Sequence, residues 1–345
     1  MGGNALKSHI AIRLTKHDYD RVAERCLTVL RALYPSGRFA AIEAYREKAD
    51  FGDLDIALAA DDYDPAQAAV ALGAVEIVRN SSVTSIGVVA DPDAPQERAA
   101  DVGDVFQVDL IQLDTDEFDY ALKYFSFNDL GNLIGRTAHK AGLTHGHSGL
   151  WYYLREGDYL FRNILLTRDY AAALTFLGYD PERFSRGFNN LEEIFAYVAG
   201  SAFFNRDIFL LENRNNQSRV RDRKRKTYTE FLKWCEARPD LPAYHYPAEK
   251  REWMPRIAEH FAHFQVEYDD AMAELERQRA VKARFNGQYV TDLTGLQGKE
   301  LGILMKNFRE AFVDVAAMHT YILQSSVDTL ATRVKALAAT LQLES

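Results

Sequence analysis

Apolar residues recur at spacings of three and four along residues 17–34, which is the period of a helix with one buried face. The pattern ends at Pro35, a residue that stops a helix. Shorter apolar runs follow, and they predict the strands of a sheet. The expected strands lie at residues 39–45, 53–60, 82–90 and 105–113, with a second helix at residues 65–72 and a turn at residues 91–95.

The helical period returns at residues 129–141, and Gly142 is a suitable end for that helix. From residue 213 onward nearly every segment has a helical pattern, and its clearest apolar stripe runs from Ile257 to Leu275. Between these regions we expect two short strands at residues 149–159 and 160–166 and two short helices at residues 169–177 and 191–199.

These patterns predict an α+β protein with three parts. Residues 1–125 are expected to form a mixed sheet with flanking helices, residues 126–212 a small α+β domain, and residues 213–345 an all-helical domain. A chain of 345 residues is long enough for two or three separate cores.

The composition is that of an ordinary globular protein, without an apolar run long enough to span a bilayer. The two cysteines, Cys26 and Cys235, provide neither a disulfide framework nor a metal-ligand spacing, which suits a reducing compartment. No signal peptide opens the sequence, so we expect a cytoplasmic protein without a membrane partner. The formal net charge of −9 argues against a surface that is basic throughout.

Three aspartates interrupt apolar predicted strands. Asp53 and Asp55 are two positions apart, so on a strand their side chains project to the same face. Asp109 interrupts a later strand in the same way. Buried carboxylates are costly without a positive partner, and three of them on one sheet face would suit two divalent ions. The alternative is that these are strand-end aspartates that meet solvent.

The aspartates belong to an ordered set of three segments. Residues 45–55 read Tyr-Arg-Glu-Lys-Ala-Asp-Phe-Gly-Asp-Leu-Asp, residues 107–110 read Gln-Val-Asp-Leu, and residues 121–150 begin Ala-Leu-Lys-Tyr-Phe-Ser-Phe-Asn. In order and spacing they resemble motifs of nucleotidyltransferases of the DNA polymerase β superfamily, most closely those of family X polymerases. The resemblance covers roughly residues 40 to 180, about 40% of the chain.

The resemblance implies that Asp53, Asp55 and Asp109 hold two Mg²⁺ or Mn²⁺ ions and catalyse transfer of a nucleotide from a nucleoside triphosphate to a 3′-hydroxyl of DNA or RNA. The three predicted parts would then be a palm-like catalytic domain, a thumb-like domain and a helical domain that grips the acceptor. The nucleotide-binding residues that the resemblance implies are Arg46, Lys48, Gly52, Tyr124, Phe125, Asn132 and Arg136.

The sequence also departs from the family pattern. Ile42 and Glu43 stand where the family has the Gly-Ser pair that holds the triphosphate, and Phe127 replaces a glycine of the third motif. Arg46 and Lys48 are the expected substitutes for that pair. The first strand is expected by residue 39, without room for the helix-hairpin-helix modules that precede the catalytic domain of repair polymerases, so we do not expect an ordinary gap-filling repair polymerase.

A second likeness lies at residues 293–304, a Gly-rich segment similar to one in CCA-adding enzymes and poly(A) polymerases. Lys299 in this segment is a candidate contact to a nucleic-acid backbone. The alternative is a plain turn between two helices, formed by Gly295 and Gly298. Exposed amides at a helix N-terminus can also hold a phosphate, so the two interpretations are compatible.

The densest basic run precedes aromatic residues at helical spacing, an arrangement that can follow a nucleic-acid backbone. Its cations are Arg219, Arg221, Arg223, Lys224, Arg225 and Lys226, followed by Tyr228, Phe231 and Trp234. The alternative is a solvated helix start whose aromatic residues belong to the core.

We therefore expect a metal-dependent nucleotidyltransferase that extends a 3′ end. The alternatives are template-independent tailing of tRNA, nucleotidyl transfer to a protein, and a non-catalytic relative that binds nucleic acid. Glu43, which would repel phosphate, supports the non-catalytic alternative, and the intact set of three aspartates argues against it. The sequence leaves open the oligomeric state and whether a template is used.

Overall fold

A computed structural model describes residues 4–91 and 104–343. Apart from Asp91, the turn expected at residues 91–95 therefore lies outside the described residues. The chain forms two compact units, the first Met1–Tyr153 with Asn163–Ala262 and the second Leu154–Arg162 with His263–Ser345. The division into three parts at residues 125 and 212 stays a prediction.

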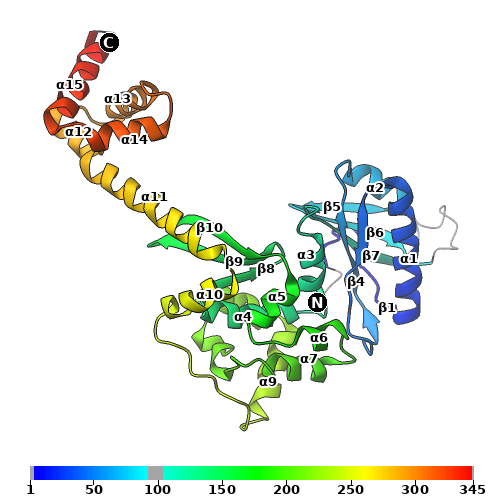
Figure 1. Ribbon diagram of the computed structural model, residues 1–345. Coiled ribbons are helices and arrows are strands. Elements are labelled where there is room, and N and C mark those ends of the chain that lie inside the picture. Colours follow the sequence, from blue (N-terminus) through cyan, green and yellow to red (C-terminus); the bar gives the residue numbers. More distant parts are fainter. Residues whose placement is uncertain (1–3, 92–103, 344–345) are drawn as a thin grey trace. The chain divides into compact units, whose positions relative to one another are not determined.

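The first unit is built on a five-stranded sheet in the order β2-β4-β7-β6-β5. β4 and β7 are parallel and the other pairs are antiparallel, so the sheet is mixed, as the sequence predicted. Figure 1 shows this sheet with α1 and α2 on one side and α3 on the other. The strands are β2 (Arg38–Ala41), β4 (Asp53–Ala59), β5 (Glu76–Asn80), β6 (Val83–Val89) and β7 (Val105–Gln112). The helices are α1 (Lys16–Leu33), α2 (Pro65–Ala71) and α3 (Phe118–Phe125).

Alternation along β4 decides which face each side chain occupies. Leu54, Ile56 and Leu58 are buried in the core that includes α1. Ala57 and Ala59 pack instead with Phe118 of α3. The odd-numbered residues of β4 therefore share the face that α3 covers.

A short antiparallel pair, β1 (Leu14–Thr15) with β3 (Asp50–Phe51), holds the segment that precedes β4. The Phe51 ring stacks on Tyr19 of α1, with 4.0 Å between the ring centroids. This contact fixes the entry of β4, where the first of the aspartates lies.

After α3 the chain forms a three-stranded sheet in the order β10-β9-β8 and then short helices. The sequence placed the β9–β10 turn too late, because Gly157, with φ +58°, makes the turn between Glu156 and Tyr159. The strands are β8 (Leu143–Gly146), β9 (Gly149–Glu156) and β10 (Tyr159–Thr167). The helices are α4 (Leu130–Lys140), α5 (Tyr170–Phe176), α6 (Pro181–Ser185), α7 (Leu191–Ala199), η2 (Arg206–Ile208), η3 (Leu211–Asn213), α8 (Asn216–Arg223), α9 (Lys226–Glu236), η4 (Lys250–Trp253) and α10 (Met254–His260).

The second unit consists of the β9–β10 tip and five helices. Its core lies among the helices and includes Val290, Phe308 and Ile322. The single stripe expected from Ile257 to Leu275 is divided between α10 and α11, because the helix is interrupted after His260. The helices are α11 (Phe264–Arg284), α12 (Gly287–Thr294), α13 (Gly298–Glu310), α14 (Val315–Gln324) and α15 (Val327–Leu343).

Two glycines form the corner between α12 and α13. Gly295 has φ +76° and Gly298 has φ +55°, a backbone region that other residues rarely adopt. This geometry confirms the expected turn between two helices. Within the described residues, no helix has both the length and the apolar character needed to cross a membrane.

Candidate active site

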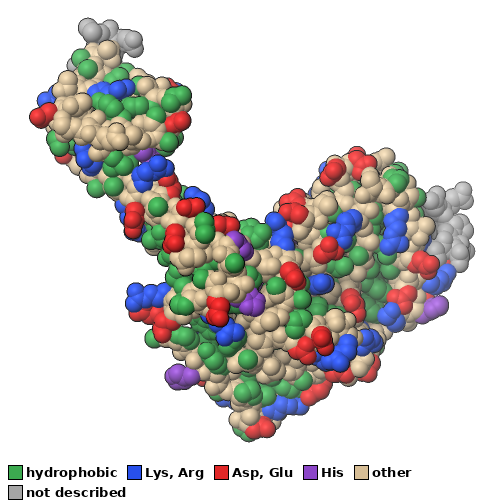
Figure 2. Space-filling view, viewed as in Figure 1, with side chains coloured by type: hydrophobic (Ala, Val, Ile, Leu, Met, Phe, Trp, Pro, Cys, Tyr) green, Lys and Arg blue, Asp and Glu red, His purple; other side chains and the backbone are tan. Residues whose placement is uncertain are grey.

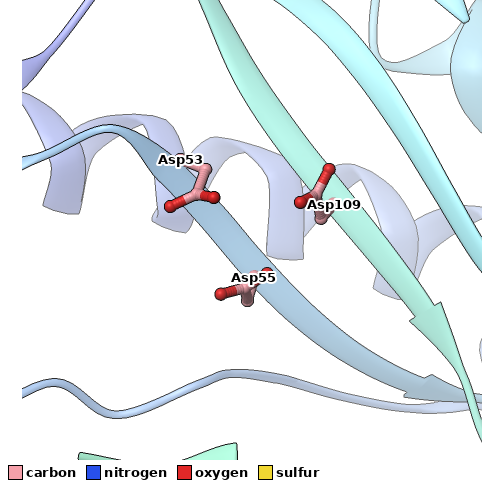
Figure 3. Close-up of side chains that lie close together, drawn as sticks. All are labelled: Asp53, Asp55 and Asp109. Atoms are coloured by element: carbon pink, nitrogen blue, oxygen red, sulfur yellow. The ribbon is translucent and has the colours of Figure 1, made fainter. Parts of the chain in front are cut away.

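The three aspartates come together on one face of the mixed sheet. Asp55 of β4 lies directly opposite Asp109 of the parallel strand β7. Asp53 also belongs to β4, two residues before Asp55. Each offers a carboxylate oxygen within 4.8 Å of the others (Figure 3). The predicted convergence is confirmed, because alternation puts all three on the side of the sheet opposite the α1 core.

The electrostatics of this cluster favour a bound cation. Burial, together with the charges of Asp53 and Asp109, raises the pKa of Asp55 to about 7. Burial also raises the pKa of Asp109, although hydrogen bonds from Ser85 and Gln107 oppose the shift. A divalent ion would remove this repulsion, and Mg²⁺ and Mn²⁺ prefer oxygen ligands of this kind.

Gln107 orients Asp109 and was missed in the sequence. Its Nε2 donates to both carboxylate oxygens of Asp109, at 2.9 and 3.0 Å. The two residues are two apart on β7, so strand alternation could have indicated the contact. By contrast, no motif indicated Arg13, whose Nη2 lies 2.5 Å from Asp50 beside the same site.

Two neighbouring cavities open next to the carboxylates. The smaller, of about 120 Å³, is lined by Asp53, Asp55, Lys48 and Phe125 among others. The larger, of about 540 Å³, also includes Asp53 and Lys48 and extends to Lys226 at the start of α9. A cavity of this size is in the range that holds small ligands, and cations and carboxylates both line it.

Lys48 is the predicted nucleotide-binding cation that lies closest to this arrangement. Burial lowers the pKa of its ammonium group, and the charges of Asp53 and Asp55 oppose that effect. Its Nζ lies 4.6 Å from the centroid of the Phe51 ring, over its face. Gly52, also in the predicted set, lines the larger cavity next to Asp53.

Arg46 is held by the loop that follows α6. Its Nη1 donates to Asn189 Oδ1 at 2.9 Å, and its Nη2 donates to the carbonyl oxygen of Arg186. Glu43 lies beside the same loop, near Gly187. A triphosphate contact by Arg46 stays a prediction, and the described contacts give it a role in joining the segment before β4 to this loop.

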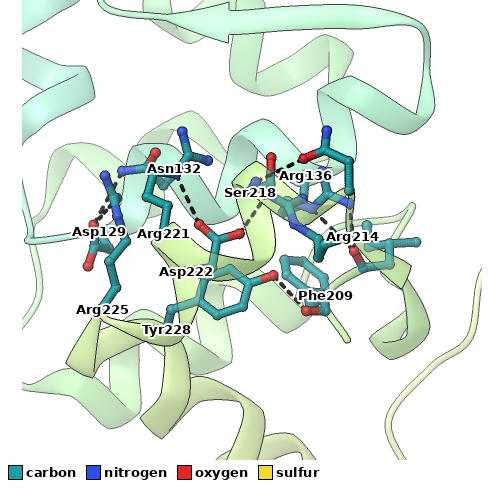
Figure 4. A network of polar contacts seen from close by, with 12 residues as sticks. Asp129, Asn132, Arg136, Phe209, Arg214, Ser218, Arg221, Asp222, Arg225 and Tyr228 are labelled. Carbon is teal, nitrogen blue, oxygen red and sulfur yellow. Dashed lines mark hydrogen bonds and ion pairs between the residues drawn. The ribbon is translucent and has the colours of Figure 1, made fainter. Parts of the chain in front are cut away.

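Three of the four remaining predicted nucleotide contacts lie apart from the carboxylates. Tyr124, Asn132 and Arg136 line a separate cavity, whereas Phe125 faces the site of the aspartates. Arg136 is buried, and its Nε and Nη2 donate to the carbonyl oxygen of Ile208 at 3.2 and 2.9 Å (Figure 4). Nothing in the local sequence around α4 could reveal this long-range partner.

The basic run is divided between the end of α8 and the start of α9. Arg221 pairs with Asp222, Arg225 with Asp129 across to α4, and Lys226 with Glu230. Arg223 and Lys224 are exposed at the junction of the two helices. Arg219 donates to Asn216, its neighbour on α8.

Two further observations bear on nucleic-acid contact. Phe231 is fully buried, so at least this aromatic residue belongs to the core, as the alternative interpretation held. On the face of the first unit that Figure 2 shows, basic and acidic side chains are interspersed. In the second unit, Lys299 is exposed in the first turn of α13, where the prediction placed it at a helix N-terminus.

No protein-family model matches this chain, and no curated protein matches its sequence. The function is therefore inferred from the chemistry of the site itself.

Proposed function

We propose that this protein is a nucleotidyltransferase of the polymerase β superfamily that transfers nucleotides from nucleoside triphosphates to the 3′-hydroxyl of DNA or RNA. The observation that carries the proposal is the cluster of Asp53, Asp55 and Asp109 on adjacent parallel strands. A set of three partly buried carboxylates is costly by itself, and divalent ions give it a function. The resemblance of the surrounding segments to family X polymerases supports the same reaction.

In this proposal the three aspartates hold two Mg²⁺ or Mn²⁺ ions. Bound there, the ions would activate the acceptor hydroxyl and neutralise charge on the leaving pyrophosphate. Gln107 fixes the orientation of Asp109, so that its oxygens are in place before any ligand binds. The protein contributes position and charge, which is most of what phosphoryl transfer requires.

The triphosphate is assigned to the larger cavity. Lys48, Lys226 and Arg13 line it. Arg13 pairs with Asp50 and Lys226 with Glu230, so Lys48 is the cation assigned to the phosphate charge beside Asp53. Phe125 lines the adjoining smaller cavity and offers a flat surface to the sugar or base. Ile42 and Glu43, which stand in place of the family's Gly-Ser pair, also line the smaller cavity, so the phosphate contact of that pair is assigned to Lys48 in the larger one.

A second candidate, template-independent addition, is favoured by the surroundings of α4. Family resemblance gives Arg136 the task of testing a base pair, but its guanidinium is buried against the carbonyl oxygen of Ile208. Arg225 also pairs with Asp129 at the start of α4. The segment from η2 to α9 thus contacts the part of α4 that a template would have to reach.

An extension assay decides between the two modes. Purified protein would be incubated with Mg²⁺, a labelled DNA or RNA primer and each nucleoside triphosphate. The extension would be compared with and without a template strand. Addition that does not depend on the template base supports tailing. Addition that follows the template base supports a polymerase, and absence of addition to every acceptor contradicts the proposed function.

A further inference from the structure

A separate cavity of about 290 Å³ lies between α4, β8 and the segment that begins α8. None of its lining residues is shared with the two cavities at the aspartates. Its polar side chains come from segments far apart in the sequence, and Figure 4 shows how they meet. Its polar lining includes Asn132, Arg136, His145, Arg214, Ser218 and Arg221.

The lining of this cavity is cationic. Arg136, Arg214 and Arg221 contribute to it, and no carboxylate among the described residues does. Asp222 pairs with Arg214 at 2.6 Å and with Arg221 at 3.2 Å, but it is not part of the lining. Three guanidinium groups therefore face the cavity while two of them share one carboxylate, which leaves a net positive charge.

Buried side-chain nitrogens at this cavity have no hydrogen-bond partner among the described residues. The Arg214 side chain is only 4% exposed, and its Nε and Nη1 have no hydrogen-bond partner within the described part of the chain. His145 is also buried, with Nδ1 at 2.8 Å from the Tyr120 hydroxyl and Nε2 without a partner there. Buried groups of this kind are usually satisfied, and guanidinium nitrogens can only donate, so the Nε and Nη1 of Arg214 indicate a ligand that supplies acceptor oxygens.

The N-terminus of α8 also favours an anionic ligand. Asn215 caps the helix by accepting from the backbone N–H of Ser218 at 2.8 Å, and both residues line the cavity. The first turn of a helix carries a partial positive charge that favours anions. The helix end and the unsatisfied Nε and Nη1 of Arg214 are independent features that select the same kind of ligand.

We propose that this cavity binds a phosphate-bearing group of nucleotide size. Arg214, Arg221 and the first turn of α8 would bind the phosphate, and the cavity is larger than a bare phosphate needs. The rings of Tyr124 and His139 also line it and offer flat surfaces to a base. The phosphate can come from a free nucleotide or from a nucleotide of the acceptor strand. Binding here requires neither the aspartates nor a metal, so it does not depend on the proposed function.

Substitution of Ser218 tests the site without removing a buried charge. Ser218→Asp places a carboxylate at the cavity, where it repels phosphate, while an acidic residue in the first turn of α8 favours the helix. Ser218→Asn is the uncharged control of similar size. We expect AMP affinity, measured by calorimetry in EDTA on the full chain, to fall at least about tenfold in Ser218→Asp and to stay close to wild type in Ser218→Asn.

A second pair of variants tests the arginines. Arg221 has a side chain that is 55% exposed, so Arg221→Gln should fold, and it should weaken AMP binding about tenfold. Lys233→Gln removes the same charge from α9, at a residue outside the lining, and should have no effect. Unchanged AMP affinity in both Ser218→Asp and Arg221→Gln would overturn the proposal, as would adenosine binding as tightly as AMP.

The source of the phosphate is read from the same titration. A 5′-phosphorylated oligonucleotide that binds more tightly than AMP assigns the cavity to the acceptor strand, and tighter binding of AMP assigns it to a free nucleotide. Absence of binding by both ligands contradicts the proposal. Asp55→Asn should abolish transfer and leave AMP binding intact, which separates a failure of this site from a failure of the catalytic one.

Discussion

Asp55 lies where burial and two neighbouring carboxylates act on its pKa in the same direction. In the unfolded chain its pKa would be near 3.8, and in the folded protein it is about 7. The folded protein therefore binds more protons between these values, so without metal its free energy of unfolding falls as pH rises from about 4 to about 7.

Asp55→Asn removes this penalty. At pH 8 and without metal, we expect the variant to be more stable than wild type by about 1–3 kcal/mol, with the difference vanishing near pH 4. Urea titrations in EDTA at both pH values measure it. Saturating Mg²⁺ should stabilise the wild type and not the variant. Equal stability at pH 8 would mean that the three carboxylates do not repel one another as the geometry indicates.

Lys48 provides the test of the triphosphate cavity. Lys48→Met keeps the apolar stem over Phe51 and removes the charge, so the melting temperature should change little. The KM for nucleoside triphosphate should rise by about tenfold, the worth of one charge-assisted contact. Lys233→Met, on the exposed side of α9, is the matched control. A KM that does not change would place the triphosphate elsewhere.

At the scale of elements, the α3–α4 junction is held by close backbone approach. A methyl group on Gly131 would overlap the carbonyl oxygen of Tyr124. Gly131→Ala should therefore lower the free energy of unfolding by about 1–3 kcal/mol, although alanine favours helices. Gly302→Ala, in α13 with open space around it, should raise stability by about 0.5–1 kcal/mol. Chemical denaturation measures both, and a neutral Gly131→Ala would show that α3 and α4 can move apart.

The α8–α9 junction offers a test of nucleic-acid contact. Arg225 and Lys226 have acidic partners, so the exposed pair Arg223 and Lys224 gives the cleaner substitution. Replacing both with glutamine should weaken binding of single strands evenly across sequences and reduce the slope of log affinity against log salt by about 1–2. If affinity and slope both persist, this junction is a solvated surface.

Local pattern predicted most elements of the sheet and the convergence of the aspartates, because strand alternation and parallel pairing follow from short-range rules. It predicted one continuous helix where the structure has α10 and α11, since the apolar spacing continues through the interruption after His260. It also could not anticipate Arg136 bonded to Ile208, or Arg214 paired with Asp222. Such contacts depend on how the chain returns to α4, which hydrophobic period does not encode.

At the scale of the whole molecule, the first unit contains both sites and the second is a helical bundle with its own core. The carboxylate site is built on rigid strands, whereas the proposed phosphate cavity is built from α4, β8 and the loop before α8. Because the two sites are built on different elements, a substitution can impair catalysis without impairing binding of the second ligand, and the reverse. A variant that combines an aspartate substitution with one at Ser218 should therefore lose as much metal affinity and as much AMP affinity as the two single variants do.

Extension of a labelled 3′ end in Mg²⁺ tests the central claim most directly. Wild-type protein would be compared with Asp109→Asn, which keeps the shape of the side chain and removes one ligand charge. We predict that wild type adds nucleotides and releases pyrophosphate, that EDTA stops the reaction, and that the variant loses at least about a hundredfold in rate while remaining folded. Extension by Asp109→Asn at the wild-type rate, or no extension by the wild type with any nucleotide and acceptor, would contradict the account.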